Sequence, residues 1–342
     1  MIPVASAYIA AGMGVLVFHL LGLPLPWLLG PIIACLTAAL AGVQLRGVKV
    51  LNEAMRTILG VAVGATFTTG LLASMVGMWP TLLLIPLMTG CIGMIGLAYF
   101  RRLWGFDFAT SYYSAMPGGL QDMLVFGEEA GGNVRTMSLV HATRVMVIVV
   151  ALPFLLVWVW DADLTNPPGV PVASLGWDQM ALMVFCGLAG WWLAKRVGMF
   201  GATILGPLLL AAILSLTGVL QHRPPAEAIW AAQFFIGMGV GCKYAGVTMA
   251  EVRRDVTAGL GFCLLLLILT VVFAEGIHLA GLAPARETIL AFAPGGQAEL
   301  TVLALIVGAD MAFVVSHHVL RIFVVILGAP LFARLFGKEE TT

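Results

Sequence analysis

A short segment that interrupts apolar sequence occurs twice in this chain, and this repetition constrains the fold more than any other feature. The first copy, residues 115–123, reads AMPGGLQDM, and the second, residues 292–300, reads FAPGGQAEL. Each contains Pro-Gly-Gly followed by an amide and a carboxylate. Proline and glycine interrupt helices, so we expect any membrane helix to break at these two places.

The two copies belong to a longer repeat, because further matches share one offset in sequence number. For the two prolines the offset is 294 − 117 = 177. The same offset joins Asn133 to Asp310, His141 to His318, Arg144 to Arg321, Pro153 to Pro330, Gly60 to Gly237 and Gly64 to Gly241. We therefore expect two copies of one unit, residues 1–160 and 178–342, joined by the proline-containing linker 161–177.

The composition places this duplicated chain in a membrane. Hydrophobic residues make up 61% and charged residues 10% of the 342, whereas about 25% of a soluble domain is charged. We expect an all-α polytopic membrane protein. The net charge is zero, which gives no indication of a nucleic-acid partner. The five cysteines lie in or beside apolar runs and are typical of small core residues, not of a disulfide framework or a metal site.

The apolar segments predict where the chain crosses the bilayer, given that a span takes about 20 residues. We expect five spans in each repeat and one broken segment, 108–127 in the first and 288–305 in the second. Asn133 and Asp310 are expected to be the N-caps of the last helix of each repeat. The expected spans are 5–22, 27–45, 57–78, 80–100 and 134–160, then 179–194, 200–219, 228–250, 257–282 and 311–335.

The basic residues of the connections favour an inverted arrangement of the two repeats. If both broken segments cross the membrane, the repeats are parallel and the basic residues divide nine inside to five outside. If both only enter and return, the second repeat is inverted and only Arg223 and Arg286 remain outside. The inside set then has twelve members: Arg46, Lys49, Arg56, Arg101, Arg102, Arg135, Lys195, Arg196, Arg253, Arg254, Arg334 and Lys338. We therefore expect inverted repeats with re-entrant segments and both termini in the cytoplasm.

Arg144 and Arg321 are the strongest candidates for a binding site. Each lies 11 residues after its expected N-cap, about 16 Å into a helix that rises 1.5 Å per residue, and so near mid-membrane. Charges at that depth usually face a cavity or a functional path. The arginines could bind an anionic substrate, or they could form internal ion pairs with Asp122 and Glu299; the sequence leaves both readings open.

The other candidate residues surround these arginines or follow the breaks. Asp122 and Glu299 suit the first turn of a half-helix through its dipole, or they could bind a coupling proton or sodium ion. His141 and His318 lie three residues before the arginines, on the same helix face, and join this coupling set. Free backbone N–H groups after each break could receive an anion. The expected substrate contacts in and after the breaks are Pro117, Gly118, Gly119, Gln121, Pro294, Gly295, Gly296 and Gln297.

The order of the duplicated motifs resembles that of the membrane AbrB family. The motifs are Leu-Gly-Pro (29–31 and 205–207), Gly-x-x-x-Gly (60–64 and 237–241) and Pro-Gly-Gly-x-x-[Asp/Glu] (117–122 and 294–299), and the resemblance spans nearly the whole chain. Members are often labelled ammonia monooxygenases, and sometimes regulators of gene expression. The family shares only its name with a small soluble DNA-binding regulator.

These features together predict a secondary transporter in the bacterial inner membrane. The expected substrate is a small, anionic organic solute, and the expected coupling ion is a proton or sodium. Two alternatives remain: a monooxygenase-like membrane oxidoreductase, and a membrane regulatory protein that affects gene expression. No spacing groups three of the six histidines, so the sequence predicts no metal site, no cofactor and no catalytic residue. A homodimer is compatible with the sequence.

Overall fold

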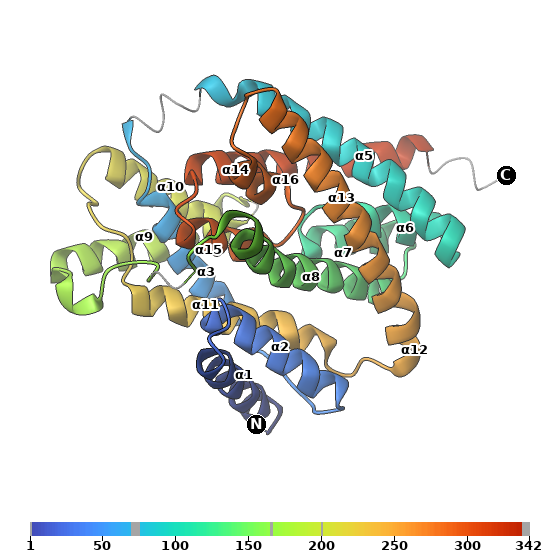
Figure 1. The fold of residues 1–342 in the computed structure, drawn as a ribbon, viewed down its shortest axis with the longest axis horizontal. Helices are drawn as coiled ribbons and strands as arrows, with labels where there is room; N and C mark the ends of the chain where they lie inside the picture. The colour runs from blue at the N-terminus through green and yellow to red at the C-terminus, as the bar shows by residue number, and fades with distance from the viewer. Residues whose placement is uncertain (1, 70–75, 165–166, 200, 337–342) are drawn as a thin grey trace. The chain divides into compact units, whose positions relative to one another are not determined.

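The computed structural model describes residues 2–69, 76–164, 167–199 and 201–336 (Figure 1). All regular secondary structure in these ranges is helical. The first half contains α1 (Ile2–Leu20), α2 (Pro26–Leu40), α3 (Lys49–Gly64), η1 (Val76–Met78), α5 (Trp79–Trp104), α6 (Phe108–Ala115), α7 (Leu120–Glu129) and α8 (Val134–Trp160). The second contains η2 (Val172–Ser174), α9 (Trp177–Arg196), α10 (Ala202–Leu216), α11 (Ala226–Gly241), η3 (Cys242–Tyr244), α12 (Met249–Glu251), the π-helical turn η4 (Val252–Val256), α13 (Thr257–Leu279), α14 (Ala285–Phe292), α15 (Gln297–Ile306) and α16 (Met311–Phe336).

The helix boundaries repeat with the offset of the sequence motifs. Helix α11 follows α3 at an offset of 177 at both of its ends, since 226 − 49 and 241 − 64 are both 177. The same offset relates α14 to α6 and α15 to α7 at both of their ends. It also relates the first residues of the long helices that follow, α8 and α16, since 311 − 134 is again 177. The duplication therefore extends from individual residues to the order and length of the helices.

The third expected span of the first repeat is misplaced in the sequence prediction. We expected residues 57–78 to be helical, whereas α3 covers 49–64 and residues 70–75 lie outside the described part. Polar side chains at the start of α3 have partners within the protein. Asn52 Nδ2 donates to the carbonyl of Phe235 at 3.1 Å, and Arg56 Nε donates to Asn52 Oδ1 at 3.1 Å. Hydropathy does not register such partners, so it places the helix too late.

Within the described residues, five helical segments are long and apolar enough to cross a membrane. They are α1, α5, α8, the continuous stretch Met249–Leu279 and residues Met311–Ala333 of α16. Helices α2 and α10 have 15 residues each, about 22 Å at 1.5 Å per residue, which is short of a core of about 30 Å. The predicted all-helical membrane class is therefore confirmed, while ten full crossings stay a prediction.

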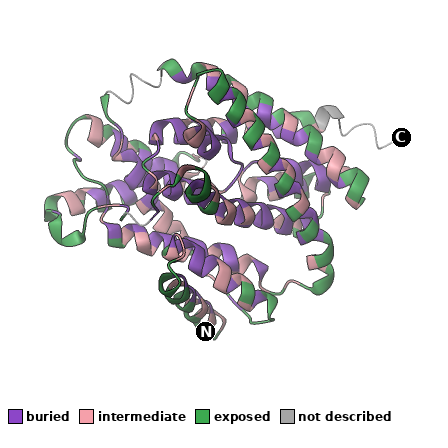
Figure 2. Ribbon diagram, in the orientation of Figure 1, coloured by how far each residue is buried: buried purple, intermediate pink, exposed green. Residues whose placement is uncertain are grey.

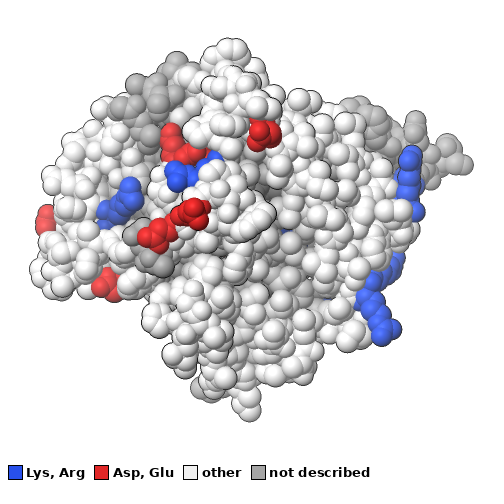
Figure 3. Space-filling view, viewed as in Figure 1, with Lys and Arg blue, Asp and Glu red and all other residues white. Residues whose placement is uncertain are grey.

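The outward faces of the long helices are apolar, as a lipid environment requires. On α5, Leu83, Leu87 and Met94 are all more than half exposed, and α9 exposes Phe185 and Leu188 to a similar extent. Figure 2 shows such exposed positions along these helices, and Figure 3 shows a surface on which charged side chains are few. Exposed apolar patches of this extent indicate contact with a membrane or another protein.

The chain forms two compact units, and each contains segments of both sequence repeats. The first unit comprises Met1–Val76, Leu152–Gly246 and Gln297–Ala312. The second unit comprises Gly77–Ala151, Val247–Gly296 and Phe313–Thr342. Helices α1–α3, α9–α11 and α15 thus lie in the first unit, and α5–α7, α13 and α14 lie in the second. The helices of the two repeats are interleaved within each unit.

Glycines bring helices of opposite repeats into close contact in the first unit. Helix α11 crosses α2 at Gly237, where an added Cβ would lie 2.5 Å from the carbonyl oxygen of Leu28. Helix α3 crosses α10 in the equivalent way, with Gly60 against the carbonyl of Ile204. The Gly-x-x-x-Gly motifs of the sequence are therefore helix-packing sites, as such motifs commonly are in membranes. Each repeat supplies one partner at both crossings.

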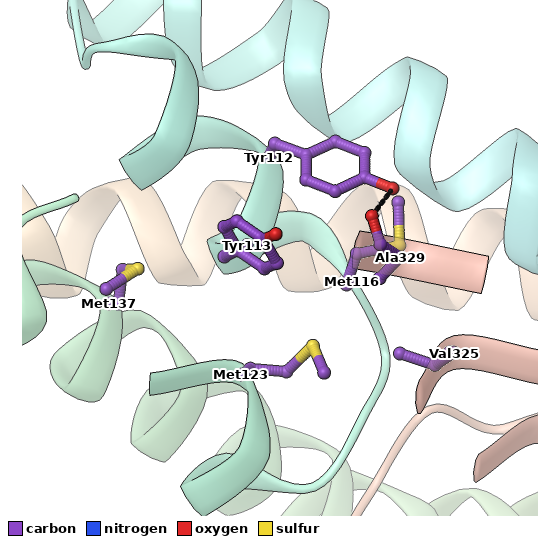
Figure 4. Close-up of a cluster of buried hydrophobic side chains, with 7 residues drawn as sticks. All are labelled: Tyr112, Tyr113, Met116, Met123, Met137, Val325 and Ala329. Carbon is purple, nitrogen blue, oxygen red and sulfur yellow. Dashed lines mark hydrogen bonds between the residues drawn. The ribbon is translucent and has the colours of Figure 1, made fainter. Parts of the chain in front are cut away.

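A buried cluster holds the first broken segment in the second unit. Figure 4 shows Tyr112 and Tyr113 of α6, Met116 of the break, Met123 of α7 and Met137 of α8 together with Val325 and Ala329 of α16. The Tyr112 hydroxyl donates to the carbonyl of Ala329 at 3.0 Å, which is the dashed line in the figure. Adaptable methionine side chains fill the space around the irregular backbone. The first break is therefore packed against a long helix of the second repeat.

Candidate functional site

Both Pro-Gly-Gly segments interrupt their helices as predicted. Helix α6 ends at Ala115 and α7 begins at Leu120; α14 ends at Phe292 and α15 begins at Gln297. Four non-helical residues separate the two helices in each case, 116–119 and 293–296. Such a break leaves carbonyl groups without helical partners on one side and N–H groups on the other. In an apolar interior these groups need partners from elsewhere.

Arg144 of α8 supplies partners for the first break. Its Nη1 donates to the carbonyl of Met116 at 2.9 Å, and its Nη2 donates to the carbonyl of Gly118 at 3.1 Å. Both carbonyls belong to the non-helical link between α6 and α7. A guanidinium fork suits two acceptors on one side, and a charged donor makes each bond stronger than a neutral one would. The arginine thereby ties the break to the long helix.

Arg321 of α16 makes the same contacts in the second repeat. Its Nη1 donates to the carbonyl of Ala293 at 2.6 Å, and its Nη2 donates to the carbonyl of Gly295 at 3.4 Å. Ala293 and Gly295 are the counterparts of Met116 and Gly118. The second repeat therefore reproduces both the buried arginine and its two hydrogen bonds to main-chain carbonyls.

The arginines do not make the ion pairs that the sequence left open. Among the described residues, neither Arg144 nor Arg321 forms a salt bridge with a carboxylate, and Asp122 and Glu299 form none with them. The arginine residues are only 3% and 5% exposed, and the Nε of each has no hydrogen-bond partner in the described part of the chain. The two guanidinium groups also lie near enough to interact electrostatically. The second unit thus buries two positive charges that repel each other.

His141 and His318 reinforce the same anchoring. His141 Nε2 lies 2.9 Å from the carbonyl of Tyr113, and His318 Nε2 lies 2.9 Å from the carbonyl of Leu290. A carbonyl only accepts, so each Nε2 carries a hydrogen in these contacts. Both residues are fully buried. Each histidine therefore binds the end of the helix before the break, three residues from an arginine that binds the break itself.

The carboxylates occupy the expected first turns but different compact units. Asp122 lies in the first turn of α7, in the second unit, and is half-buried. Glu299 lies in the first turn of α15, in the first unit, and is 4% exposed. The dipole of each helix favours a negative charge there. Their predicted role in ion coupling stays a prediction.

The remaining predicted contacts lie in or directly after the breaks. Pro117, Gly118, Pro294 and Gly295 are buried, while Gly119 and Gly296 are half-buried. A Cβ on Gly118 would lie 2.8 Å from Val325 Cγ1. The side chain of Gln121 lies outside the described residues. Gln297 Nε2 is buried and has no partner within them.

One polar contact near the site was not predicted. His317, beside His318, is fully buried, and its Nε2 lies 2.9 Å from the hydroxyl of Thr81 on α5. No role is assigned to this histidine from the sequence. The described residues contain no group of three or more His, Cys, Asp or Glu side chains that could hold a metal ion. A contact across 236 residues has no local sequence signal.

Comparison with known proteins identifies the family. Residues 27–337 match the family described as Transition state regulatory protein AbrB. The uncharacterized protein YhjN of Bacillus subtilis (strain 168) is 27% identical over 351 residues, which cover 94% of this chain and 90% of the relative. A protein of Escherichia coli (strain K12) named as a regulator, AbrB, is 25% identical over 329 residues, which cover 95% of this chain and 92% of the relative. The resemblance inferred from the duplicated motifs is confirmed, and the chain belongs to the AbrB family.

Proposed function

We propose that this protein is a secondary transporter of a small organic anion in the bacterial inner membrane. The observation that carries the proposal is the pair Arg144 and Arg321: both are buried, bound to main-chain carbonyls and without a carboxylate partner among the described residues. Arginines that serve only as structural anchors would be expected to have their charge neutralised.

The energetics of buried charge supports an anionic ligand. An ion of this size loses several kcal/mol of hydration on burial, even after the protein relaxes. Two carbonyl hydrogen bonds recover part of that loss but leave each arginine with its full positive charge. Because the two groups also repel each other, an anion that contacts both Nε–H groups would offset hydration loss and repulsion together. A carboxylate or dicarboxylate has the geometry for such contacts.

The predicted topology gives this site a transport mechanism. Inverted repeats with broken helices near the midplane are typical of secondary transporters, in which one bundle moves against another to expose the site to alternate sides. The twelve-to-two distribution of basic residues supports inverted repeats with both termini in the cytoplasm. Asp122 and Glu299, at the starts of their half-helices, are proposed to bind the coupling proton or sodium ion.

A regulatory role is the second candidate, because the Escherichia coli relative is named as a regulator. In that case an anion would bind at the same arginines and change the contacts of a partner, without net movement across the membrane. The two candidates share a binding site and differ in flux. A test of function must therefore measure both binding and transport.

The binding test is a thermal-shift screen of the detergent-purified protein with monocarboxylates, dicarboxylates, sulfonates and phosphates. A ligand of the native state raises the melting temperature as its concentration rises. We expect Arg144→Gln and Arg321→Gln to weaken binding of the stabilising anion by about 30-fold or more, from roughly 2 kcal/mol per lost buried charged contact. The exposed Arg253 provides the control Arg253→Gln, which should bind like wild type.

Arg144→Lys distinguishes a loss of folding from a loss of binding. The lysine retains the positive charge, but it cannot donate to both carbonyls of the break as the guanidinium does. A folded Arg144→Gln or Arg321→Gln protein that binds the anion like wild type would contradict the arginine site. Uptake of the same labelled anion into proteoliposomes distinguishes the two candidates. Saturable uptake driven by a proton or sodium gradient supports the transporter, and binding with no uptake supports the regulator.

A further inference from the structure

A buried hydrogen-bonded chain links α16 to α5 in the second unit. His317 is fully buried, and its Nδ1 lies 2.7 Å from the carbonyl of Phe313, one turn earlier on α16. Its Nε2 lies 2.9 Å from Thr81 Oγ1, and Thr81 Oγ1 lies 2.8 Å from the carbonyl of Met78. Thr81 is 1% exposed. Four polar groups thus follow one another in an apolar setting.

The hydrogens of this chain can be arranged in two ways that differ by one proton. The Phe313 carbonyl only accepts, so His317 Nδ1 carries a hydrogen in both arrangements. If the ring is neutral, Nε2 accepts the single hydrogen of the Thr81 hydroxyl, and the Met78 carbonyl receives none from it. If the ring is protonated, Nε2 donates to Thr81, which then donates to Met78. Only the protonated arrangement uses every contact, and no heavy atom has to move between the two.

This chain adjoins the second arginine site. His317 and Arg321 are four residues apart on α16, which places them on one helix face about 6 Å apart at their Cβ atoms. The ring of Phe292 lies 5.4 Å from the His317 ring, and the next residue, Ala293, gives its carbonyl to Arg321. Around His317, α5 presents Thr81, α14 presents Phe292, and α16 adds the titratable His318 and the charged Arg321.

We propose that His317 takes up one proton when an anion binds at Arg321, so that the protein carries the anion together with a proton. This inference rests on the anion site proposed above. Without an anion, a positive imidazolium would repel Arg321 in a medium of low dielectric constant. A bound anion attracts the imidazolium, and so it favours protonation of His317 where Arg321 alone opposes it. Solvent supplies the proton to Nε2, the Thr81 hydrogen turns from Nε2 to the Met78 carbonyl, and deprotonation on release reverses both steps.

The first repeat lacks this chain, which sets the stoichiometry. At the offset that relates the two repeats, the counterpart of His317 is Val140 and the counterpart of Thr81 is Ala258. Neither side chain can carry or pass a proton. The histidine chain therefore contributes one proton per anion and not two, in addition to any ion that Asp122 and Glu299 bind, although the arginine contacts are duplicated.

One test follows the protonation of the ring with and without succinate. Nitrogen-15 NMR of histidine-labelled protein resolves the six histidines, and the signal lost in His317→Gln belongs to His317. We expect its Nε2 to carry no hydrogen without an anion and to become protonated when saturating succinate is added, because the bound anion offsets the charge of Arg321. Thr81→Val removes the hydroxyl to which a protonated Nε2 donates and should weaken this response, while Thr81→Ser keeps the hydroxyl and should restore it. A His317 ring that keeps the same protonation state when succinate binds overturns the proposal.

The second test measures proton uptake with succinate as the probe anion, using a pH-sensitive dye in weakly buffered detergent solution. Wild type should take up about one proton more per succinate bound than His317→Gln does, and over the pH range of that extra uptake its apparent Kd should rise about tenfold more per pH unit. His317→Gln should bind succinate without this proton, and His278→Gln, at an exposed histidine, should behave like wild type.

The two proposals fail in different ways. Succinate binding that requires Arg321, with proton uptake unchanged in His317→Gln, overturns the coupling role and leaves the anion site intact. Binding that is unchanged in Arg321→Gln overturns the anion site. If succinate does not bind, both measurements are made with the anion that the thermal-shift screen identifies, and failure of every anion in that screen to bind overturns both proposals.

Discussion

The crossing of α11 over α2 yields a quantitative prediction for Gly237→Ala. A Cβ at this position would lie 2.5 Å from the carbonyl oxygen of Leu28 and 3.4 Å from Ile32 Cγ1. Real Cβ atoms hardly ever approach a neighbour closer than 3.0 Å, so the two helices must move apart. The atom in the way is main chain, which cannot rotate aside as a flexible side chain could.

The energetic effect follows from the packing that this separation removes. A gap of about 0.5–1 Å forfeits roughly a quarter to a half of the dispersion energy of each contact it opens. The neighbouring Gly241, whose added Cβ would lie 2.6 Å from Cys35 Cβ, shows that the close approach continues for another turn. Overpacking of this kind destabilises by about 1–3 kcal/mol. At about 2–4 °C per kcal/mol, we expect a melting temperature lowered by roughly 2–12 °C.

The assay is thermal unfolding of the detergent-purified protein, with Gly12→Ala as the matched control. Gly12 also lies within a helix of the first unit, but nothing lies within 4 Å of where its Cβ would be. Both substitutions gain the same helix propensity, so their difference isolates the steric term. Gly60→Ala, at the equivalent crossing, should destabilise as Gly237→Ala does. A Gly237→Ala protein as stable as Gly12→Ala would refute the reasoning.

Three further predictions concern the second unit and metal content. Asn133→Ala should lower the free energy of unfolding by about 1 kcal/mol, because Asn133 Oδ1 accepts from the Thr136 N–H at 3.1 Å. Asn133→Asp keeps the acceptor, so an equal loss of stability in both variants would contradict the role of Asn133 as a cap. Tyr112→Phe removes the hydroxyl that donates to the Ala329 carbonyl and should lower the free energy of unfolding, measured by chemical denaturation, by about 1 kcal/mol. Unchanged stability would contradict a stabilising role for this hydrogen bond. Purified protein should contain no stoichiometric copper or iron by mass spectrometry, and one metal per chain would favour the oxidoreductase.

The sequence predicted features whose signal is local. The breaks fall at the Pro-Gly-Gly segments because proline and glycine interrupt helices in any context. Helix α8 begins directly after Asn133, which caps it as expected. The constant offset between the repeats also predicted that Arg144 and Arg321 would have equivalent environments, and their main-chain contacts are equivalent.

Other features depend on contacts between distant residues and could not be predicted. The choice between an ion pair and another partner for Arg144 was open, because a carbonyl acceptor is present at every position and leaves no mark in the sequence. The start of α3 depends on a bond from Asn52 to a carbonyl 183 residues away. The division into compact units also crosses the repeat boundary, so a sequence period alone does not reveal it.

The crossed pairing of α3 with α10 also has a consequence for synthesis of the protein. The carbonyl that contacts Gly60 belongs to Ile204, which a ribosome adds only after it has made the whole first repeat, the linker and α9. At roughly 5–20 residues per second, about 7–30 s pass between the synthesis of Gly60 and the synthesis of Ile204. Helix α11, by contrast, finds α2 already made. During that interval the nascent first half needs lipid, the insertion machinery or a chaperone to cover α3, and a chain that stops after the first repeat would leave this face uncovered.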